Sequence, residues 1–292
     1  MTIRVYSPTT LEEAYAILRE RGAQLHVLAG GTDLMVSINL RLLAPHEVLN
    51  IWSLRELRGI HEEETTLRLG ALTTYTEIIH SPLVQRHCSI LVEAAKTIGA
   101  VQTQNRGTIG GNIVNASPAG DTLPVLAVFD AELELGSARG TRRVSINEFY
   151  TGYRQTIRQP DELLLAVRIP KQQPDERTFF YKVGTRQAQA ISKVVIAAKA
   201  RVQADGLLNS IQIGLGSVAP TVVRARQTEA FLTNKILSPQ LIQQAKEVIQ
   251  RDIHPITDFR STESYRRHVT ATLLVRFLQQ CLDGQAIRAA CE

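Results

Sequence analysis

The chain has 292 residues, of which 44% are hydrophobic and 21% charged, and its formal net charge is +5. This length accommodates two or three domains with real cores, and the composition is that of an ordinary globular protein. No apolar run predicts a transmembrane helix and no signal-peptide core opens the sequence, so we expect a cytoplasmic protein without membrane insertion. The basic residues are scattered, which favours a solvated surface over nucleic-acid binding.

Residues that commonly bind metals are few and widely spaced. Cys88, Cys281 and Cys291 form no CxxC pair, and the seven histidines include no HExxH motif. We expect reduced thiols in a cytosolic protein. An iron–sulfur cluster needs more cysteines at closer spacing, so no metal site is predicted on this chain.

The first half of the chain alternates helical and extended patterns. A helix is predicted over 10–22, where Thr10 and Glu13 suit a capping box and Gly22 suits the C-terminal cap. A turn over 30–33 follows a short apolar run at 25–29. Further on, the pattern predicts strands at 47–52 and 67–72, a helix at 90–98 ended by Gly99, a helix at 122–129, and strands at 131–135 and 163–169.

The composition changes at residues 171–176, a polar stretch that contains Pro174. We place the domain boundary here, between 1–173 and 174–292. Beyond it the sequence predicts strands at 179–183, 194–202 and 211–215, with a turn at 204–206 between the last two. Helices opened by Ser238-Pro239 and by Ser261 complete the chain. A small sheet followed by helices is typical of an α+β module.

Two similar glycine-rich segments stand out, LAGGTDL (28–34) and TIGGNIV (108–114). Glycine permits positive φ and close approach of a ligand to the backbone, and successive N–H groups form a nest for an anion. Two such turns brought together could hold both phosphates of a pyrophosphate. On this basis a valine at Gly110 is expected to weaken ligand binding more than folding.

A simpler interpretation is that each glycine pair only makes a tight turn. Neither GxGxxG nor GxxxxGK[ST] is present, so the segments are neither a Rossmann fingerprint nor a P-loop. The pairing of two such segments favours a ligand role, as do the polar residues in and after the second, Asn112, Asn115, Ser117 and Asp121. Asp121 alone is equally explained as the N-cap of the helix at 122–129.

The chain resembles the flavin-binding subunits of molybdenum hydroxylases, the family of bacterial xanthine dehydrogenases, carbon monoxide dehydrogenase and related aldehyde and N-heterocycle dehydrogenases. The resemblance covers essentially the whole chain. The segments that carry it are VLAGGTDL (27–34), RELRGI (55–60), TIGGNIVNASPAGDTLPVLAVFDAELEL (108–135), YKVGTR (181–186) and IGLGSVAPTVVRA (213–225).

This resemblance implies a fold and an oxidoreductase function. The fold is α+β, with a two-lobed FAD-binding domain, lobes at about 1–58 and 59–173, and a C-terminal domain with a small antiparallel sheet and helices. FAD would lie extended between the lobes. Electrons would pass from [2Fe–2S] clusters on a small partner subunit through FAD to an acceptor such as NAD⁺. A large molybdopterin subunit, most readily of a xanthine dehydrogenase-type complex, would oxidise the substrate.

The resemblance also implies which residues bind FAD, and it names no catalytic residue on this chain. The first segment lines the pyrophosphate and ribityl region, the second forms the facing turn, and the remaining residues lie near the flavin. The expected set is Val27, Leu28, Ala29, Gly30, Gly31, Thr32, Asp33, Leu34, Ile98, Thr108, Ile109, Gly110, Gly111, Asn112, Ser117, Asp121, Leu164 and Lys182.

Alternatives remain at three of these positions and for the function as a whole. By pattern alone Ile98 and Leu164 are ordinary core residues, and Lys182 is a strand lysine on a solvent face. Ile98 also stands where some members have an aromatic residue beside the flavin. Carbon monoxide, aldehydes and N-heterocycles stay open as substrates, and quinone or oxygen as acceptor. A stand-alone flavin oxidase and a non-enzymatic phospholigand-binding module are the competing functions.

Overall fold

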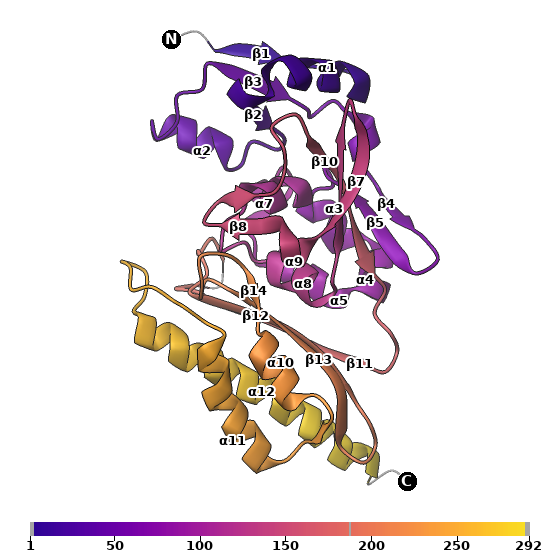
Figure 1. Ribbon diagram of the computed structural model, residues 1–292, viewed down its shortest axis with the longest axis vertical. Coiled ribbons are helices and arrows are strands. Elements are labelled where there is room, and N and C mark those ends of the chain that lie inside the picture. Colours follow the sequence, from indigo (N-terminus) through magenta and orange to yellow (C-terminus); the bar gives the residue numbers. More distant parts are fainter. Residues whose placement is uncertain (1–2, 187, 290–292) are drawn as a thin grey trace.

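A computed structural model describes residues 3–186 and 188–289. Three layers follow one another along the long axis of the molecule (Figure 1). The N-terminal lobe lies at one end, a second lobe with a five-stranded sheet lies in the middle, and the C-terminal sheet with its helices lies at the other end. The chain is therefore α+β, with two lobes ahead of a C-terminal domain, as the sequence predicts.

The first lobe is a small parallel sheet covered by helices. Its strands β1 (Arg4–Tyr6), β3 (Glu47–Asn50) and β2 (Leu25–Leu28) lie in the order β1-β3-β2, with helices α1 (Leu11–Arg21) and α2 (Leu34–Asn39) and 3₁₀ turns η1 (Gly22–Gln24) and η2 (Arg55–Leu57). Its core is shared with the next sheet, because Leu18 and Leu49 pack with Leu163 and Leu165. The first lobe therefore depends on the second for its buried surface.

The second lobe is built on an antiparallel sheet with the strand order β4-β5-β10-β6-β7. Its strands are β4 (Ile60–Glu62), β5 (Thr66–Gly70), β6 (Glu132–Ser137), β7 (Gly140–Ser145) and β10 (Leu163–Pro170). Its helices are α3 (Tyr75–His80), α4 (Pro82–His87), α5 (Ser89–Lys96), α6 (Val101–Gln104), α7 (Ile109–Asn115), α8 (Leu123–Val128) and α9 (Ile146–Phe149). A separate hairpin, β8 (Tyr150–Gly152) with β9 (Gln155–Thr156), projects beside α7 (Figure 1).

The C-terminal domain is an antiparallel sheet with helices on the face away from the second lobe (Figure 1). Its strands are β11 (Glu176–Val183), β12 (Val194–Val202), β13 (Leu207–Gly216), β14 (Val223–Arg224) and β15 (Lys235–Ile236). Helices α10 (Arg226–Leu232), α11 (Pro239–Val248) and α12 (Glu263–Ala289) and the 3₁₀ turn η3 (Ile249–Arg251) follow. The predicted turn at 204–206 is present, with Gly206 at φ +92°.

Several predictions about helices and their caps are wrong. The second glycine segment is not a turn, because Gly110 and Gly111 lie inside α7. Asp121 does not cap α8, whose N-cap is Thr122 without a side-chain bond. The capping box of α1 is incomplete: Thr10 accepts from the Glu13 N–H, but the Glu13 carboxylate accepts from Thr9. Gly22 ends α1 in the right-handed region and continues into η1.

The last helix also begins later than predicted, at Glu263, and the Thr262 hydroxyl rather than Ser261 accepts an N–H of its first turn. Cys88 and Cys281 are free and buried, and burial raises the pKa of Cys88 to about 12 and of Cys281 to about 11. Cys291 lies outside the described residues. Across residues 3–186 and 188–289, none of the helices has the length and apolarity of a membrane span.

Candidate functional site

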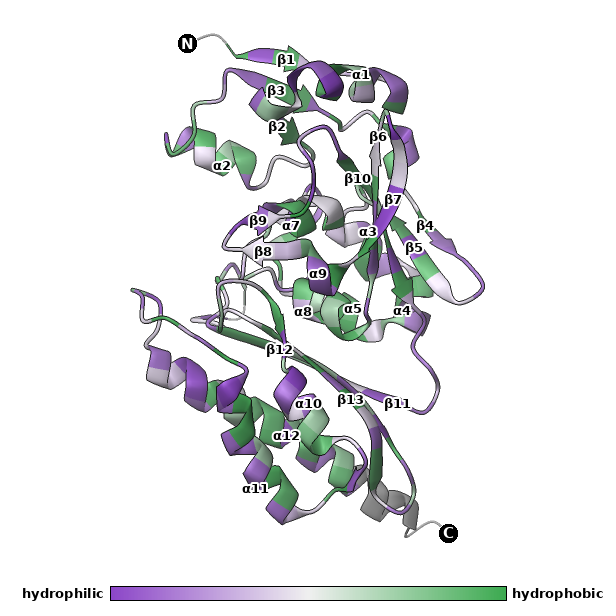
Figure 2. Ribbon diagram, viewed as in Figure 1, coloured by the Kyte–Doolittle hydropathy of each residue, from purple (hydrophilic) through white to green (hydrophobic). Residues whose placement is uncertain are grey.

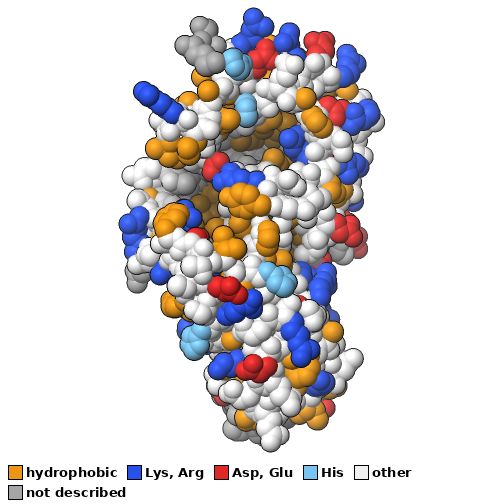
Figure 3. All heavy atoms as spheres, turned by 60° about the vertical axis from the view of Figure 1, so that its left-hand side comes forward, with side chains coloured by type: hydrophobic (Ala, Val, Ile, Leu, Met, Phe, Trp, Pro, Cys, Tyr) orange, Lys and Arg blue, Asp and Glu red, His pale blue; other side chains and the backbone are white. Residues whose placement is uncertain are grey.

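A wide cleft of about 660 Å³ lies between the first and second lobes. Figure 3 shows the molecular surface hollowed below the N-terminal lobe, with hydrophobic side chains in the walls. The first glycine segment forms one wall, α7 the opposite wall, and Leu163 and Leu164 of β10 also line it. The cleft is therefore where the two glycine segments meet, as the sequence predicts.

The first glycine segment offers free backbone donors to this cleft. Within the described residues, the N–H groups of residues 30–33 donate no hydrogen bond to the protein. Gly31 has φ +78°, a conformation that favours glycine, and a Cβ at Gly30 would overlap the carbonyl oxygen of Arg106. This segment is therefore pressed against the second lobe and presents an open nest that can bind an anion.

The second glycine segment does not form a comparable nest. Its N–H groups are already used: Ile109 donates to Thr73 O at 3.0 Å, Gly110 to Ala71 O at 2.9 Å, and Gly111 to the Thr108 hydroxyl at 3.1 Å. A Cβ at Gly110 would lie 2.6 Å from the Ala71 Cβ. The glycine at 110 thus allows α7 to pack against the segment after β5, and a valine there would disturb that packing first.

A slightly smaller cavity of about 590 Å³, which we call the narrow cavity, adjoins the cleft and reaches the C-terminal domain. Ile98, Thr103 and Asn112 line both spaces, so the two form one elongated site. Its polar wall is the ion pair between Asp121 and Lys182, at 2.6 Å.

The Asp121–Lys182 pair is buried, with side chains only 8% and 7% exposed. Lys182 also donates to the Thr97 carbonyl at 2.9 Å, so it does not face solvent as a lone strand lysine would. Burial raises the pKa of Asp121, and Lys182 opposes that rise. Among the described residues the second oxygen of Asp121, Oδ1, has no hydrogen-bond partner, which leaves a buried acceptor beside the cavity.

Most of the predicted site residues line these two connected spaces. Those on the wide cleft are Val27, Ala29, Gly30, Gly31, Thr32, Asp33, Leu34, Ile98, Thr108, Gly110, Gly111, Asn112 and Leu164. Asp121 and Lys182 line the narrow cavity. Three expected residues lie outside both linings: Leu28 at the end of β2, Ile109 in the core of the second lobe, and Ser117, whose hydroxyl accepts from Ala119 N–H.

Sequence reasoning missed several residues that line the cleft. Tyr75 has a buried hydroxyl without a hydrogen-bond partner in the described part of the chain, and burial raises its pKa, which keeps it protonated as a donor. Arg154 and Arg158 enter from the segment after β8. No periodicity or glycine pattern marks these positions, because tertiary packing alone places them at the cleft.

Comparison with known proteins identifies relatives of the whole chain. A family model described as the FAD binding domain in molybdopterin dehydrogenase matches residues 1–172. A second, described as the CO dehydrogenase flavoprotein C-terminal domain, matches residues 179–281. The xanthine dehydrogenase FAD-binding subunit of Escherichia coli O157:H7 is 32% identical over 276 residues, which cover 94% of each chain.

Two further relatives act on different substrates according to their names. The nicotinate dehydrogenase FAD-subunit of Eubacterium barkeri is 29% identical over 282 residues, or 95% of each chain. A solved structure of carbon monoxide dehydrogenase from Hydrogenophaga pseudoflava superposes with a TM-score of 0.92 at 29% identity, covering 97% of this chain and 98% of the other.

Proposed function

Because this chain belongs to the family of FAD-binding subunits of the molybdopterin dehydrogenases, we propose that it is the electron-transfer subunit of a xanthine dehydrogenase-type complex. The chain is an oxidoreductase subunit and carries the FAD-binding domain of that family. In the proposed complex it receives electrons from [2Fe–2S] clusters on a small subunit and delivers them to NAD⁺. A large molybdopterin subunit oxidises the substrate.

The described residues fit FAD. When bound, FAD supplies the chemistry that collects single electrons and releases them in pairs, while the protein positions it and adjusts its electronics. The free N–H groups of residues 30–33 suit a phosphate, and the elongated site continues to a second cavity large enough for a ring system. The unpaired Oδ1 of Asp121 suits a ligand N–H donor.

Each expected residue then has a role that follows from its place. The first glycine segment holds the pyrophosphate through its backbone, and Ile98 and Leu164 supply apolar surface. Asp121 and Lys182 meet the flavin in the narrow cavity. The second glycine segment contributes the shape of α7 rather than a second nest. We assign the FAD-binding domain to 1–173, with lobes at about 1–58 and 59–173, and the C-terminal domain to 174–292.

A different substrate for the complex is the second candidate. The high structural similarity to carbon monoxide dehydrogenase and the comparable identity to a nicotinate dehydrogenase subunit favour this alternative. None of the residues that line the two cavities distinguishes these substrates, since in either complex the substrate binds to the molybdopterin subunit. The shared proposal for this chain is electron transfer through FAD.

The first test examines the purified chain alone. Heating should release intact FAD, because the lining of the narrow cavity and the two glycine segments contain no cysteine or histidine that could link covalently to the flavin. Release of FMN, or failure of the chain to bind added FAD, would contradict the assignment of the pyrophosphate nest.

The second test adds partners under anaerobic conditions. The isolated chain should show no flavin bleaching with xanthine, nicotinate, an aldehyde or carbon monoxide. The reconstituted three-subunit complex should bleach with one of these, and that substrate decides between the candidates. Bleaching of the isolated chain by any of them would instead support a stand-alone oxidase.

A further inference from the structure

The wide cleft requires a positive group that the glycine segments do not provide. The free N–H groups of residues 30–33 are backbone dipoles, and Asp33 places an exposed carboxylate beside them. Glu162 adds a second carboxylate to the same lining. A pyrophosphate carries negative charge of its own, so a cation in this wall would offset an otherwise unfavourable field.

Two arginines line this cleft, and they differ in their exposure and in whether their buried donors have hydrogen-bond partners. Arg154 donates from Nη1 to the Asn115 side chain at 2.9 Å and is exposed. Arg158 donates from Nη1 to the carbonyl oxygens of Gln159, at 2.9 Å, and Glu162, at 2.7 Å. Its Nε is buried and has no hydrogen-bond partner within the described residues.

The environment of Arg158 indicates an incompletely compensated cation. Burial lowers its pKa, although Glu162 and Asp161 oppose that shift. Glu162 is itself engaged, because its carboxylate accepts two bonds from Arg142 and one from the Gln159 N–H. A buried guanidinium donor without an acceptor is unfavourable, and because the Arg158 side chain lines the cleft, its charge can be offset by an anionic ligand there.

We propose that Arg158 is a further cofactor-binding residue, whose guanidinium binds the adenosine diphosphate half of FAD. This inference rests on the proposed function and deepens it. Arg158 lines the wide cleft together with the first glycine segment, to which the pyrophosphate is assigned, so its contact falls on the adenosine diphosphate half of the dinucleotide. The two carbonyl contacts hold the side chain in place before the ligand arrives, which reduces the entropy lost on binding.

The test is a fluorescence titration of the flavin-free full chain with FAD, with FMN and ADP as partial ligands. Arg158→Gln should weaken FAD binding about ten- to a hundredfold, the effect of one charge-assisted hydrogen bond, and should weaken ADP competition equally. FMN binding should not change. Arg158→Lys keeps the charge without the planar fork, so it should recover part of the loss.

Arg142→Gln is the matched control, because Arg142 binds the carboxylate of Glu162, whose backbone carbonyl Arg158 binds, but does not line either cavity. It should weaken FAD binding less than about threefold. Equal losses in both variants would assign the effect to a loosened Glu162 and overturn the proposal, as would unchanged binding in Arg158→Gln or an equal loss for FMN. Failure of the unmodified chain to bind FAD would instead refute the proposed function.

Discussion

Where the first lobe meets the second, the facing surfaces enclose a cleft of about 660 Å³, whereas the second lobe meets the C-terminal domain mainly through packed side chains. We call these the upper seam, lined by residues 30–33, α7 and Arg158, and the lower seam, formed by α8 against β12 and β13. At the lower seam Ala197 of β12 belongs to the core of the second lobe, and a Cβ at Gly214 would overlap the Pro124 carbonyl.

The upper seam therefore has the features of a ligand-binding surface, whereas the lower seam has those of a permanent contact between domains. Figure 2 shows hydrophobic residues along α5, α8 and β12, where the lower seam closes. The upper seam instead retains N–H groups that bond no protein acceptor and a buried guanidinium donor without a partner among the described residues. The buried donor costs stability until a ligand binds. At the narrow cavity, beside Asp121 and Lys182, the lower seam opens to join the site.

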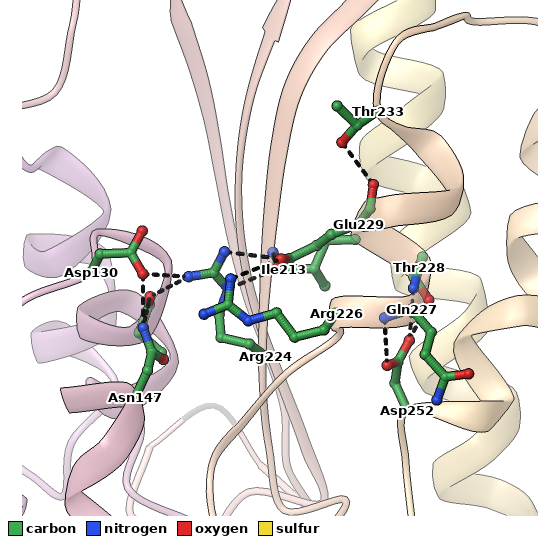
Figure 4. A network of polar contacts seen from close by, with 11 residues as sticks. Asp130, Asn147, Ile213, Arg224, Arg226, Gln227, Thr228, Glu229, Thr233 and Asp252 are labelled. Atoms are coloured by element: carbon green, nitrogen blue, oxygen red, sulfur yellow. Dashed lines mark hydrogen bonds and ion pairs between the residues drawn. The ribbon is translucent and has the colours of Figure 1, made fainter. Parts of the chain in front are cut away.

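The largest expected effect is at the polar centre of the lower seam. Arg224 is 5% exposed and bonds Glu229 at 2.7 Å and Asp130 at 2.7 Å (Figure 4). Arg224→Ala leaves Glu229 buried without its main partner, so we expect a loss of about 3–5 kcal/mol in the free energy of unfolding. Urea denaturation of both proteins would measure it.

Arg226→Ala is the matched control for that variant. Arg226 also approaches Glu229, at 3.6 Å, but is 62% exposed, so its loss should change stability by about 0.5 kcal/mol or less. Similar losses for the two variants would show that the buried Arg224–Glu229 pair stabilises the protein no more than the exposed contact of Arg226 with Glu229.

The next effect concerns the backbone contact that joins the lobes at the upper seam. Gly30→Ala would force the first glycine segment away from Arg106, at a cost of about 1–3 kcal/mol. Because this segment also carries the free N–H groups, FAD affinity should fall by about a hundredfold. Gly152→Ala, whose Cβ would meet only the flexible Gln155 side chain, is the control expected to retain FAD. If Gly30→Ala retained FAD, FAD binding would not depend on the contact between the first glycine segment and Arg106.

The sequence predicts long elements of the C-terminal domain but not the chemistry of the upper seam. β12 and α11 have strong periodic patterns, and the pattern located them within a few residues. Glycine pairs usually mark turns, so the pattern predicts a turn at the second glycine segment, yet Gly110 lies in a helix and packs against Ala71. Arg158 has no local pattern, since its importance arises only from the carbonyls and the cleft that the fold brings to it.

A smaller effect is expected at the edge of the upper seam, around the sole tryptophan. The guanidinium carbons of Arg58 and Arg106 lie 4.3 Å and 3.9 Å from the centroid of the Trp52 ring, so the ring joins the first lobe to the second. Trp52→Leu should cost about 1–2 kcal/mol, the sum of two cation–π contacts, and reduce FAD affinity only a few-fold. Trp52→Phe should recover part of both. Unchanged stability in Trp52→Leu would show that the stacking contributes nothing to the seam.

The smallest expected effect is a pH dependence of the stability that Glu162 contributes at the upper seam. Burial raises the pKa of Glu162, but the bonds from Arg142 and Gln159 outweigh it and hold the pKa below the ordinary value of 4.5. Its stabilisation is therefore complete above pH 4.5 and is lost as the pH falls through the lowered pKa. Glu162→Gln should be about 1 kcal/mol less stable at neutral pH, and this gap should close in acid. Urea denaturation across this range, with exposed Glu132→Gln as control, measures it. A gap that persisted in acid would mean that Glu162 stabilises the upper seam through neutral hydrogen bonds, and the carboxylate charge would then have no part in positioning the wall that carries Arg158.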